Sequence, residues 1–174
     1  AGKRADAGVK QKLAKYNSSL SKTDPLATFR TSLHGGDAER GKAVFTGFAQ
    51  TQCMRCHKID KHGGDAGPDL SKISEKNPRQ YLLEAIVSPS AKIAKGFETI
   101  SVVTDDGKVF SGVIKSETDT HVHLVDIQGK PIAIAKASIE QRSKTPKSSM
   151  PEGMTKLLTR QQLRDLIEYL AQRK

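Results

Sequence analysis

The sequence has no tryptophan, few aromatic residues and only two cysteines among its 174 residues. Aromatic side chains supply much of the core in most domains, but here they make up 5% of the chain. A bound apolar cofactor would supply the missing core. No run of about 18 apolar residues exists, which excludes a membrane-spanning helix of the usual length. The first residues also lack the apolar stretch of a signal peptide. We therefore expect that a signal was removed or that the chain was cut from a longer protein.

The formal net charge of +10 is concentrated at the two ends of the chain. Residues 1–22 hold six basic and one acidic residue, and residues 141–174 hold eight and three, whereas residues 23–140 hold fifteen of each. Basic surface attracts nucleic acid, anionic lipid or an acidic protein partner, or is simply solvated. Because each of these segments contains only one aromatic residue, Tyr16 and Tyr169, we expect no nucleic-acid partner.

Helical periodicity occurs in three segments of the chain. The predicted helices cover about 38–48, after the N-cap residue Asp37, then about 78–87, and finally the segment that Thr159 and Gln162 begin as a capping box. Gly41 lies inside the first of them, where glycine costs up to about 1 kcal/mol relative to alanine. That cost predicts a close backbone contact at Gly41.

Residues from about 97 to 140 follow a different pattern, rich in β-branched residues that alternate with polar ones. The turn sequences "DDGK" and "IQGKP" divide them. They predict a small antiparallel sheet of about four strands, inserted between helices. Residues 1–35 are polar and basic and predict a linker or arm, partly helical, so we place the folded domain at 36–174.

Cys53, Cys56 and His57 form the pattern C-x-x-C-H, the attachment signature of c-type haem. The two thiols add across the vinyl groups of the porphyrin as thioethers, and a two-residue spacer on a tight turn matches the separation of those vinyls. The adjacent imidazole of His57 can then bind the iron. The pattern predicts one covalently attached haem c.

Other uses of the two cysteines receive less support. Structural zinc needs four ligands, and Cys53 and Cys56 could in principle reach that number with His121 and His123, at a spacing unusual for a zinc finger. A redox dithiol would follow a strand of a βαβ unit, which the chain does not predict. A disulfide at this spacing would close a very small loop. His62 has the pattern of a solvated loop residue.

The iron of such a haem also needs a sixth ligand or an open site, and the chain has three methionines. Met54 lies inside the tether and cannot reach the opposite face of the ring. Met150 precedes a proline in an irregular segment, where an apolar side chain would be exposed to solvent unless something such as the iron held it. Met154 precedes the final helix and could simply pack in the core. We favour Met150 over Met154; a thioether opposite imidazole raises the reduction potential.

The segments "GDAERGKAVF", "CMRCH", "GPDL", "SMP" and "LRDLIEYL" follow one another in this order. Together they resemble a class I c-type cytochrome from about residue 36 to residue 170. The resemblance implies a mainly α cytochrome c fold, in which the N- and C-terminal helices cross over a haem. At that crossing Gly41 and Phe45 would face Leu166 and Tyr169.

The same resemblance assigns a role to the segment "GPDL". The carbonyl of Pro68, which follows Gly67, would accept a hydrogen bond from the ring of His57. Such a bond fixes the tautomer of a metal-binding histidine and keeps its other nitrogen available for the iron.

The connection of 92 residues between His57 and Met150 is much longer than in small class I cytochromes. The predicted sheet accounts for the excess. The stretch "YLLEAIVSPSAKIAKGFETISVVTDDGKVFSGVI", with "SSMPEGM" after it, resembles the planctomycete/verrucomicrobial-type haem-binding domain. That resemblance implies a module at the C-terminus of a large dehydrogenase-like protein, with residues 1–35 as the linker.

We therefore expect a mono-haem cytochrome that carries single electrons from an attached or partner oxidoreductase and is not itself an enzyme. Haem attachment of this kind implies a periplasmic or equivalent compartment. The basic final segment adjoins Met150 and predicts an acidic docking surface on the partner. The alternatives are a five-coordinate haem sensor or peroxidase-like site, a docking module built on the sheet, and a zinc-binding module.

Overall fold

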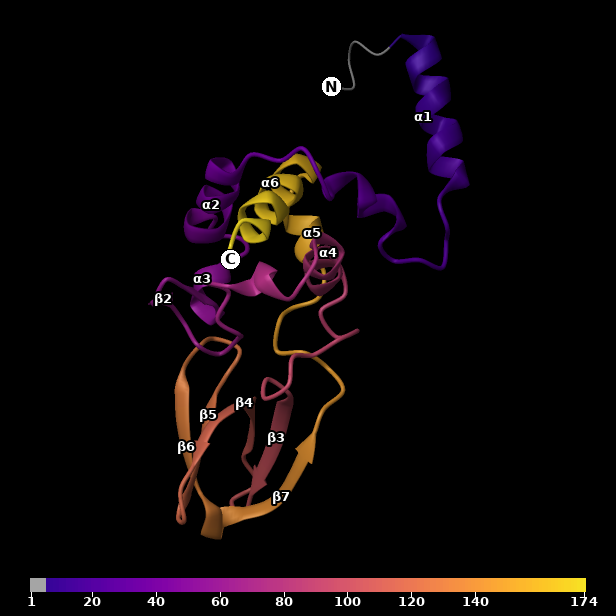
Figure 1. Ribbon diagram of the computed structural model, residues 1–174. Helices are drawn as coiled ribbons and strands as arrows, with labels where there is room; N and C mark the ends of the chain where they lie inside the picture. The colour runs from indigo at the N-terminus through magenta and orange to yellow at the C-terminus, as the bar shows by residue number, and fades with distance from the viewer. Residues whose placement is uncertain (1–5) are drawn as a thin grey trace.

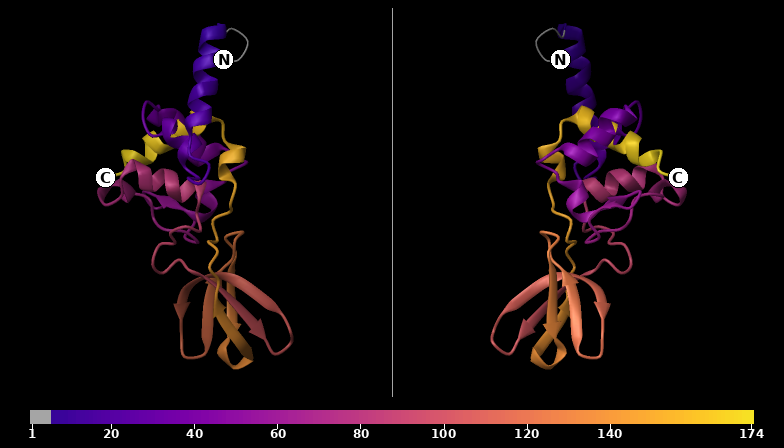
Figure 2. Two further views of the ribbon diagram at one scale, coloured as in Figure 1. Left: turned by 90° about the vertical axis from the view of Figure 1, so that its right-hand side faces the viewer. Right: turned by 90° about the vertical axis from the view of Figure 1, so that its left-hand side faces the viewer.

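The computed structural model describes residues 6–174, so the first five residues of the expected basic arm lie outside it. The described chain forms a helical unit and a β-sheet unit, which lie end to end in all three views (Figures 1 and 2). The first helix, α1 (Ala7–Ser19), stands away from both. No helix in residues 6–174 is long and apolar enough to cross a bilayer.

The helical unit is built from short elements that are far apart in the sequence. Its α-helices are α2 (Ala38–Gly47), α3 (Cys53–Cys56), α4 (Arg79–Val87), α5 (Met154–Leu157) and α6 (Arg160–Ala171). It also contains the 3₁₀ turns η1 (Ala27–Ser32) and η2 (Ile73–Glu75) and the two-residue strands β1 (Lys58–Ile59) and β2 (His62–Gly63). One apolar core connects α2, α4, α5 and α6.

Helices α2 and α6 cross in close contact, as the sequence predicted. A Cβ atom on Gly41 would lie 1.9 Å from the backbone oxygen of Asp165, so no larger residue fits without a shift of one helix. The rings of Phe45 and Tyr169 pack with their centroids 5.9 Å apart. The predicted glycine contact is confirmed, and of the two predicted partners Tyr169 lies against both Gly41 and Phe45.

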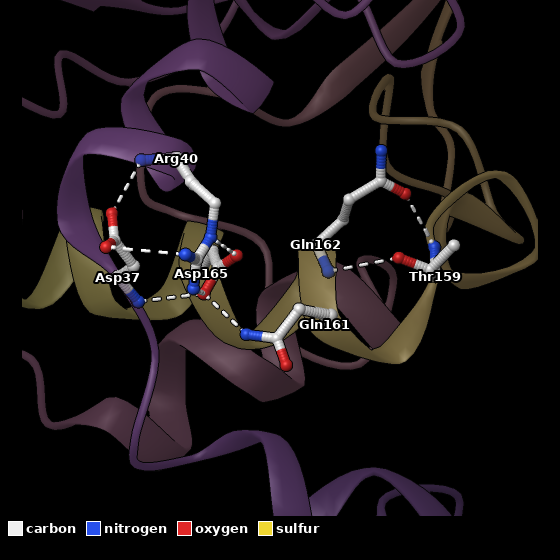
Figure 3. A network of polar contacts seen from close by, with 6 residues as sticks. All are labelled: Asp37, Arg40, Thr159, Gln161, Gln162 and Asp165. Atoms are coloured by element: carbon white, nitrogen blue, oxygen red, sulfur yellow. Dashed lines mark hydrogen bonds and ion pairs between the residues drawn. The ribbon is translucent and has the colours of Figure 1, made fainter. Parts of the chain in front are cut away.

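A buried carboxylate joins the two helices at this crossing (Figure 3). Asp165 on α6 is 2% exposed. One of its oxygens accepts hydrogen bonds from the backbone N–H of Asp37, at 2.7 Å, and from Gln161, at 2.8 Å; the other accepts from Nε of Arg40, at 2.9 Å. Burial raises the pKa of Asp165, but these hydrogen bonds outweigh it and hold the pKa below its ordinary value. The carboxylate is therefore ionised at neutral pH.

Both predicted helix caps at this crossing are present. The Asp37 side chain accepts a hydrogen bond from the N–H of Arg40 at the start of α2. Thr159 and Gln162 form the predicted capping box, with both reciprocal bonds (Figure 3). These local signals fix where the two crossing helices begin.

The expected arm at residues 1–35 is loose only in its first part. Helix α1 has no buried residue, and Val9 and Leu13 are each 55% exposed. Leu26 and Ala27, however, are buried, and Leu26 belongs to the core of the helical unit. The folded unit therefore begins well before residue 36, because Leu26 packs in its core and η1, which starts at Ala27, contacts α6.

The sheet unit has five strands, one more than the sequence predicted. They are β3 (Thr99–Thr104), β4 (Val109–Glu117), β5 (His121–Val125), β6 (Pro131–Ala135) and β7 (Ile139–Lys144), paired antiparallel in the order β6-β5-β4-β3-β7. The additional strand is β7. Its sequence IEQRSK is largely exposed at the edge of the sheet and carries no apolar alternation, so periodicity could not reveal it.

The sheet unit has its own small core and is attached to the helical unit at one end. Buried apolar residues of its strands form a cluster separate from the core of the helical unit. The chain enters and leaves the sheet at neighbouring points, where the N–H of Thr145 donates to the carbonyl of Thr99 at 2.9 Å. The 3₁₀ turn η3 (Lys136–Ser138), between β6 and β7, lies at the opposite end (Figure 1).

Candidate functional site

A cavity with mainly apolar walls lies inside the helical unit. It encloses about 1230 Å³ of space free of protein atoms, part of it open to solvent. Its walls come from the α2–α6 crossing, α3, the loop that follows α3, α4, the loop 89–97 and the loop 148–151. Apolar lining residues include Phe45, Ala66, Leu70, Ile73, Tyr81, Leu82, Ile86, Phe97, Leu158, Leu166 and Leu170.

Both cysteines reach this cavity from the single turn of α3. Gln52, in the left-handed region with φ 46°, begins the turn, and the N–H of His57 ends it with a hydrogen bond of 2.9 Å to the carbonyl of Cys53. Cys53, Cys56 and His57 all line the cavity. The two thiols and the imidazole of the C-x-x-C-H pattern therefore converge on one apolar space.

The ring of His57 is held on one side by the loop that follows. Nδ1 of His57 lies 2.9 Å from the carbonyl oxygen of Pro68. A carbonyl only accepts, so Nδ1 carries the proton and the other nitrogen, Nε2, has a free lone pair. Burial lowers the pKa of His57, although the bond to Pro68 raises it. The imidazole is neutral at neutral pH, which is the form that binds a metal.

Gly67 fits tightly against the same ring. A Cβ atom at this position would lie 2.5 Å from Cε1 of His57. The N–H of Gly67 also donates to the carbonyl of Cys56, at 2.8 Å. The hydrogen bond to Pro68 that the sequence resemblance implied is present, and Gly67 is required because any side chain there would push the ring away.

The chemistry of the two thiols argues against a redox dithiol. Both cysteines are free and partly buried, and burial raises the pKa of each thiol. A reactive or metal-binding cysteine normally has a lowered pKa, because the thiolate is the reactive species. Cys53 and Cys56 are therefore neutral thiols at neutral pH.

The four residues of the zinc alternative do not come together. His121 and His123 lie on β5 of the sheet unit, with ring centroids 6.2 Å apart. Within residues 6–174, no group of three or more His, Cys, Asp or Glu side chains is placed to hold a metal ion. His62 is exposed, and its Nδ1 lies 2.8 Å from the carbonyl oxygen of Asp60.

Met150 and Met154 both line the cavity, but their surroundings differ. Met150 lies in a loop, partly buried, and its N–H donates to the hydroxyl of Ser148 at 3.1 Å. The N–H of Ser148 in turn donates to Ser90, so the loop is fastened to the segment that follows α4. Met154 begins α5, is 6% exposed and belongs to the core.

The sequence did not identify one further part of the cavity wall. It is formed by the apolar face of α4, through Tyr81, Leu82 and Ile86, and by the loop that ends at Phe97. The apolar face of α4 was visible in the sequence, but periodicity cannot distinguish a face that packs on protein from one that packs on a ligand. The C-x-x-C-H pattern and the shortage of aromatic residues predicted a cofactor in the core, but neither indicated that α4 would line its cavity.

The residues present fit a covalently attached haem. The cavity offers apolar walls, two neutral thiols one helical turn apart, and a histidine nitrogen with a free lone pair. The apolar walls would cover the faces of the porphyrin, the two thiols would form its thioether bonds, and the free histidine nitrogen would bind its iron. A fourth feature, a methionine in a loop of the same cavity, is also present.

The comparisons with known proteins agree with this fit. The family model for cytochrome c matches residues 38–102, which include α2, the C-x-x-C-H pattern and "GPDL" but neither Met150 nor α6. No curated protein matches the chain. A cytochrome c domain carries a covalently bound haem c with its iron and acts as an electron-transfer module with redox partners. Cytochromes of this type are typically extracytoplasmic.

Proposed function

We propose that the chain is a mono-haem c-type cytochrome domain with one histidine and one methionine ligand, which carries single electrons from an oxidoreductase to a downstream acceptor. The observation that supports this most strongly is the convergence of Cys53, Cys56, His57 and Met150 on one apolar cavity. We assign the haem thioethers to Cys53 and Cys56, the proximal ligand to His57 and the distal ligand to Met150.

When bound, the haem supplies the iron that accepts and returns one electron. The protein residues then have separate tasks. Cys53 and Cys56 hold the group covalently, His57 presents Nε2, and Pro68 keeps the proton of the ring on Nδ1. The apolar walls exclude water, which disfavours the additional charge of the oxidised state. The chain itself makes and breaks no bonds of a substrate.

The choice of Met150 rests on its place in the chain. A ligand that arrives from a loop can approach the iron after the cavity walls have formed, whereas Met154 is already packed in the core. The serine hydroxyl that accepts from the Met150 N–H restricts the loop. A methionine opposite histidine raises the reduction potential and suits electron transfer rather than ligand sensing.

The visible spectrum of the purified protein in both redox states tests this function. We expect the bands of haem c on reduction, haem that remains with the polypeptide under denaturing conditions, and the weak band of iron–sulfur ligation in the oxidised state. A colourless protein would contradict the proposal that haem is bound and would favour the alternative of a zinc-binding module. Haem without the sulfur band, together with ready binding of CO or cyanide, would instead favour a five-coordinate sensor or peroxidase-like site.

We further propose that the domain is of the planctomycete/verrucomicrobial type, that it works with a fused or partner dehydrogenase-like protein, and that it is periplasmic or in an equivalent compartment. Residues 1–35 would serve as the linker to that partner, although Leu26 packs in the core of the helical unit and Ala27 is buried. The proposal is supported by the segment "YLLEAIVSPSAKIAKGFETISVVTDDGKVFSGVI" and by the inserted sheet.

The partner surface that meets this domain should be acidic. Lys144, Lys147 and Lys156 lie on both sides of Met150 in the sequence, and all three are exposed. Electrostatic steering raises association rates by roughly 10- to 1000-fold and is screened by salt. Oxidation of the reduced protein by the anion hexacyanoferrate(III) should therefore slow by about tenfold from low to high salt.

A matched pair of variants separates local from overall charge in that experiment. Lys147→Gln should weaken the salt dependence, whereas Lys136→Gln, in η3 at the far end of the sheet, removes the same charge and should leave it nearly unchanged. Equal effects of the two variants would mean that the surface beside Met150 is not the docking surface.

A further inference from the structure

We propose that Lys115, on the inserted sheet, is a positioning residue for His57: it holds the loop that carries Pro68 and so tunes the haem. The inference rests on the proposed function, because it assigns a role towards the haem to a residue outside the helical unit. It also gives the inserted sheet a task in that unit.

Lys115 occupies an irregular position in its strand. The pairing of β4 with β5 passes from Ile114–Leu124 directly to Ser116–His123, so Lys115 is the extra residue of a β-bulge. Bulges bend a strand and redirect a side chain, and they are frequent next to functional sites. Residues 109–113 of β4 pair with β3 and residues 113–117 with β5. The bulge lies in the second of these halves.

The redirected side chain connects the sheet to two parts of the helical unit. Nζ of Lys115 donates to the backbone carbonyl of Asp65 at 2.6 Å and lies 3.6 Å from the Asp65 carboxylate. It also lies 5.4 Å from the centroid of the Phe97 ring, which lines the cavity. The Lys115 side chain is 29% exposed, so these contacts hold a cation mostly away from water.

The carbonyl that Lys115 binds belongs to the loop that orients His57. This loop is attached to α3 through Gly64, whose N–H donates to the carbonyl of Met54, and through Gly67, whose N–H donates to that of Cys56, both at 2.8 Å. Asp65 lies between these two attachment points, and Pro68 follows directly after the second. Lys115 therefore holds the loop at a point between its two attachments to α3.

A second contact brings the sheet to the same place. A Cβ atom on Gly129, in the turn between β5 and β6, would lie 3.1 Å from the carbonyl oxygen of Arg55 in α3. The sheet therefore meets the helical unit both at the tether and at the loop that follows it. Because β4, which carries Lys115, is paired with β5, this second contact limits how far Lys115 can move away from the loop.

The expected consequence has a definite sign. The hydrogen bond from His57 to Pro68 makes the imidazole a stronger donor to iron and favours the oxidised state. A looser loop weakens that bond, so Lys115→Met should raise the reduction potential. Direct loss of such a partner changes metal affinity by 10- to 100-fold; for an indirect loosening we expect the ratio of oxidised to reduced haem at a fixed potential to fall about threefold.

Charge alone predicts the opposite sign. Removing a positive charge near the iron stabilises the oxidised state, which would lower the potential. Lys136→Met removes the same charge from η3, at the far end of the sheet, and is the control for overall charge. Lys115→Arg keeps a cationic donor and should restore the potential of the parent protein.

The experiment compares the reduction potentials of the four holoproteins and the solvent exchange of the His57 Nδ1 proton in their NMR spectra. The inference expects a higher potential and faster exchange in Lys115→Met, and near-parental values in Lys115→Arg and Lys136→Met. A potential for Lys115→Met that is unchanged or lower would overturn the positioning role while leaving the cytochrome function intact. Absence of haem from the parent protein would overturn both proposals. If Lys115→Met does not retain haem, a Lys115→Arg protein with parental exchange would support the role and one with fast exchange would refute it.

Discussion

The Met150→Ala protein is expected to have a reduction potential lower than that of the parent protein by roughly tenths of a volt. Axial ligands set haem potentials over a range of about 0.8 V, and Met150→Ala would remove the proposed thioether ligand, which favours the reduced state. The cavity would also open to water and small ligands at that position. Potentiometric titration followed by the visible spectrum measures the change, and the band of iron–sulfur ligation should disappear with it.

Met154→Ala is the matched control, because Met154 lines the same cavity and has the same side chain. Its 6% exposure places it in the core, so its truncation should cost about 2–5 kcal/mol of unfolding free energy while leaving the potential nearly unchanged. The two variants thus separate a ligand from a packing residue. A potential that falls in Met154→Ala and not in Met150→Ala would exchange the two assignments.

Replacing Gly41 by alanine should destabilise the protein by about 3 kcal/mol or more. The new Cβ atom would meet the backbone oxygen of Asp165 and the Cβ of Tyr169, and backbone atoms cannot move aside as a flexible side chain does. Overpacking of a core usually costs about 1–3 kcal/mol, and here it must separate two helices that enclose the cavity. Denaturant unfolding of the holoprotein, followed by haem absorption, measures the loss.

Gly47 provides the comparison within the same helix. A Cβ atom there meets nothing within 4 Å, so Gly47→Ala should change stability by at most about 1 kcal/mol, in the stabilising direction, because alanine has the higher helix propensity. Similar losses in both variants would show that helix propensity or the unfolded state, and not the crossing, determines the effect.

Much of the helical unit could be predicted from the sequence because its signals are local or belong to a known pattern. Asp37 and the Thr159–Gln162 capping box define helix starts within a few residues. Gly41 inside a helix has a cost that only a close approach explains. Such signals need no information about which segments meet in space.

The parts that the sequence did not predict depend on contacts between distant segments. Strand β7 is polar and exists because β3 offers it a partner edge. Leu26 and Ala27 look unremarkable in a polar arm until α6 and the core are in place to cover them. Lys115 is one of many lysines in the chain, and only the bulge in β4 directs it towards Asp65.

The candidate site could also be predicted only where its signals are local in the sequence. The C-x-x-C-H pattern and "GPDL" identify one side of the cavity by their residue types alone. The part of the wall formed by α4 and the loop that ends at Phe97 consists of ordinary apolar residues. Their position around a cofactor, and the choice between two methionines of one cavity, follow from the three-dimensional arrangement and from experiment.

The hydrogen bond between Thr145 and Thr99 also bears on how the two proposed iron ligands find each other during folding. The 92 residues between His57 and Met150 would close as a long flexible loop if they were unstructured. Once β3 and β7 pair, residues 100–144 no longer add to the length of the loop that must close. The flexible connection is then residues 58–99 and 145–149, about half of the original length. Halving a loop recovers only about 0.6 kcal/mol of closure entropy. An inserted unit whose ends lie side by side therefore hardly changes the entropic cost of bringing the two proposed iron ligands together. A fold of this kind can gain or lose a folded sheet at this point with little effect on the formation of its iron site.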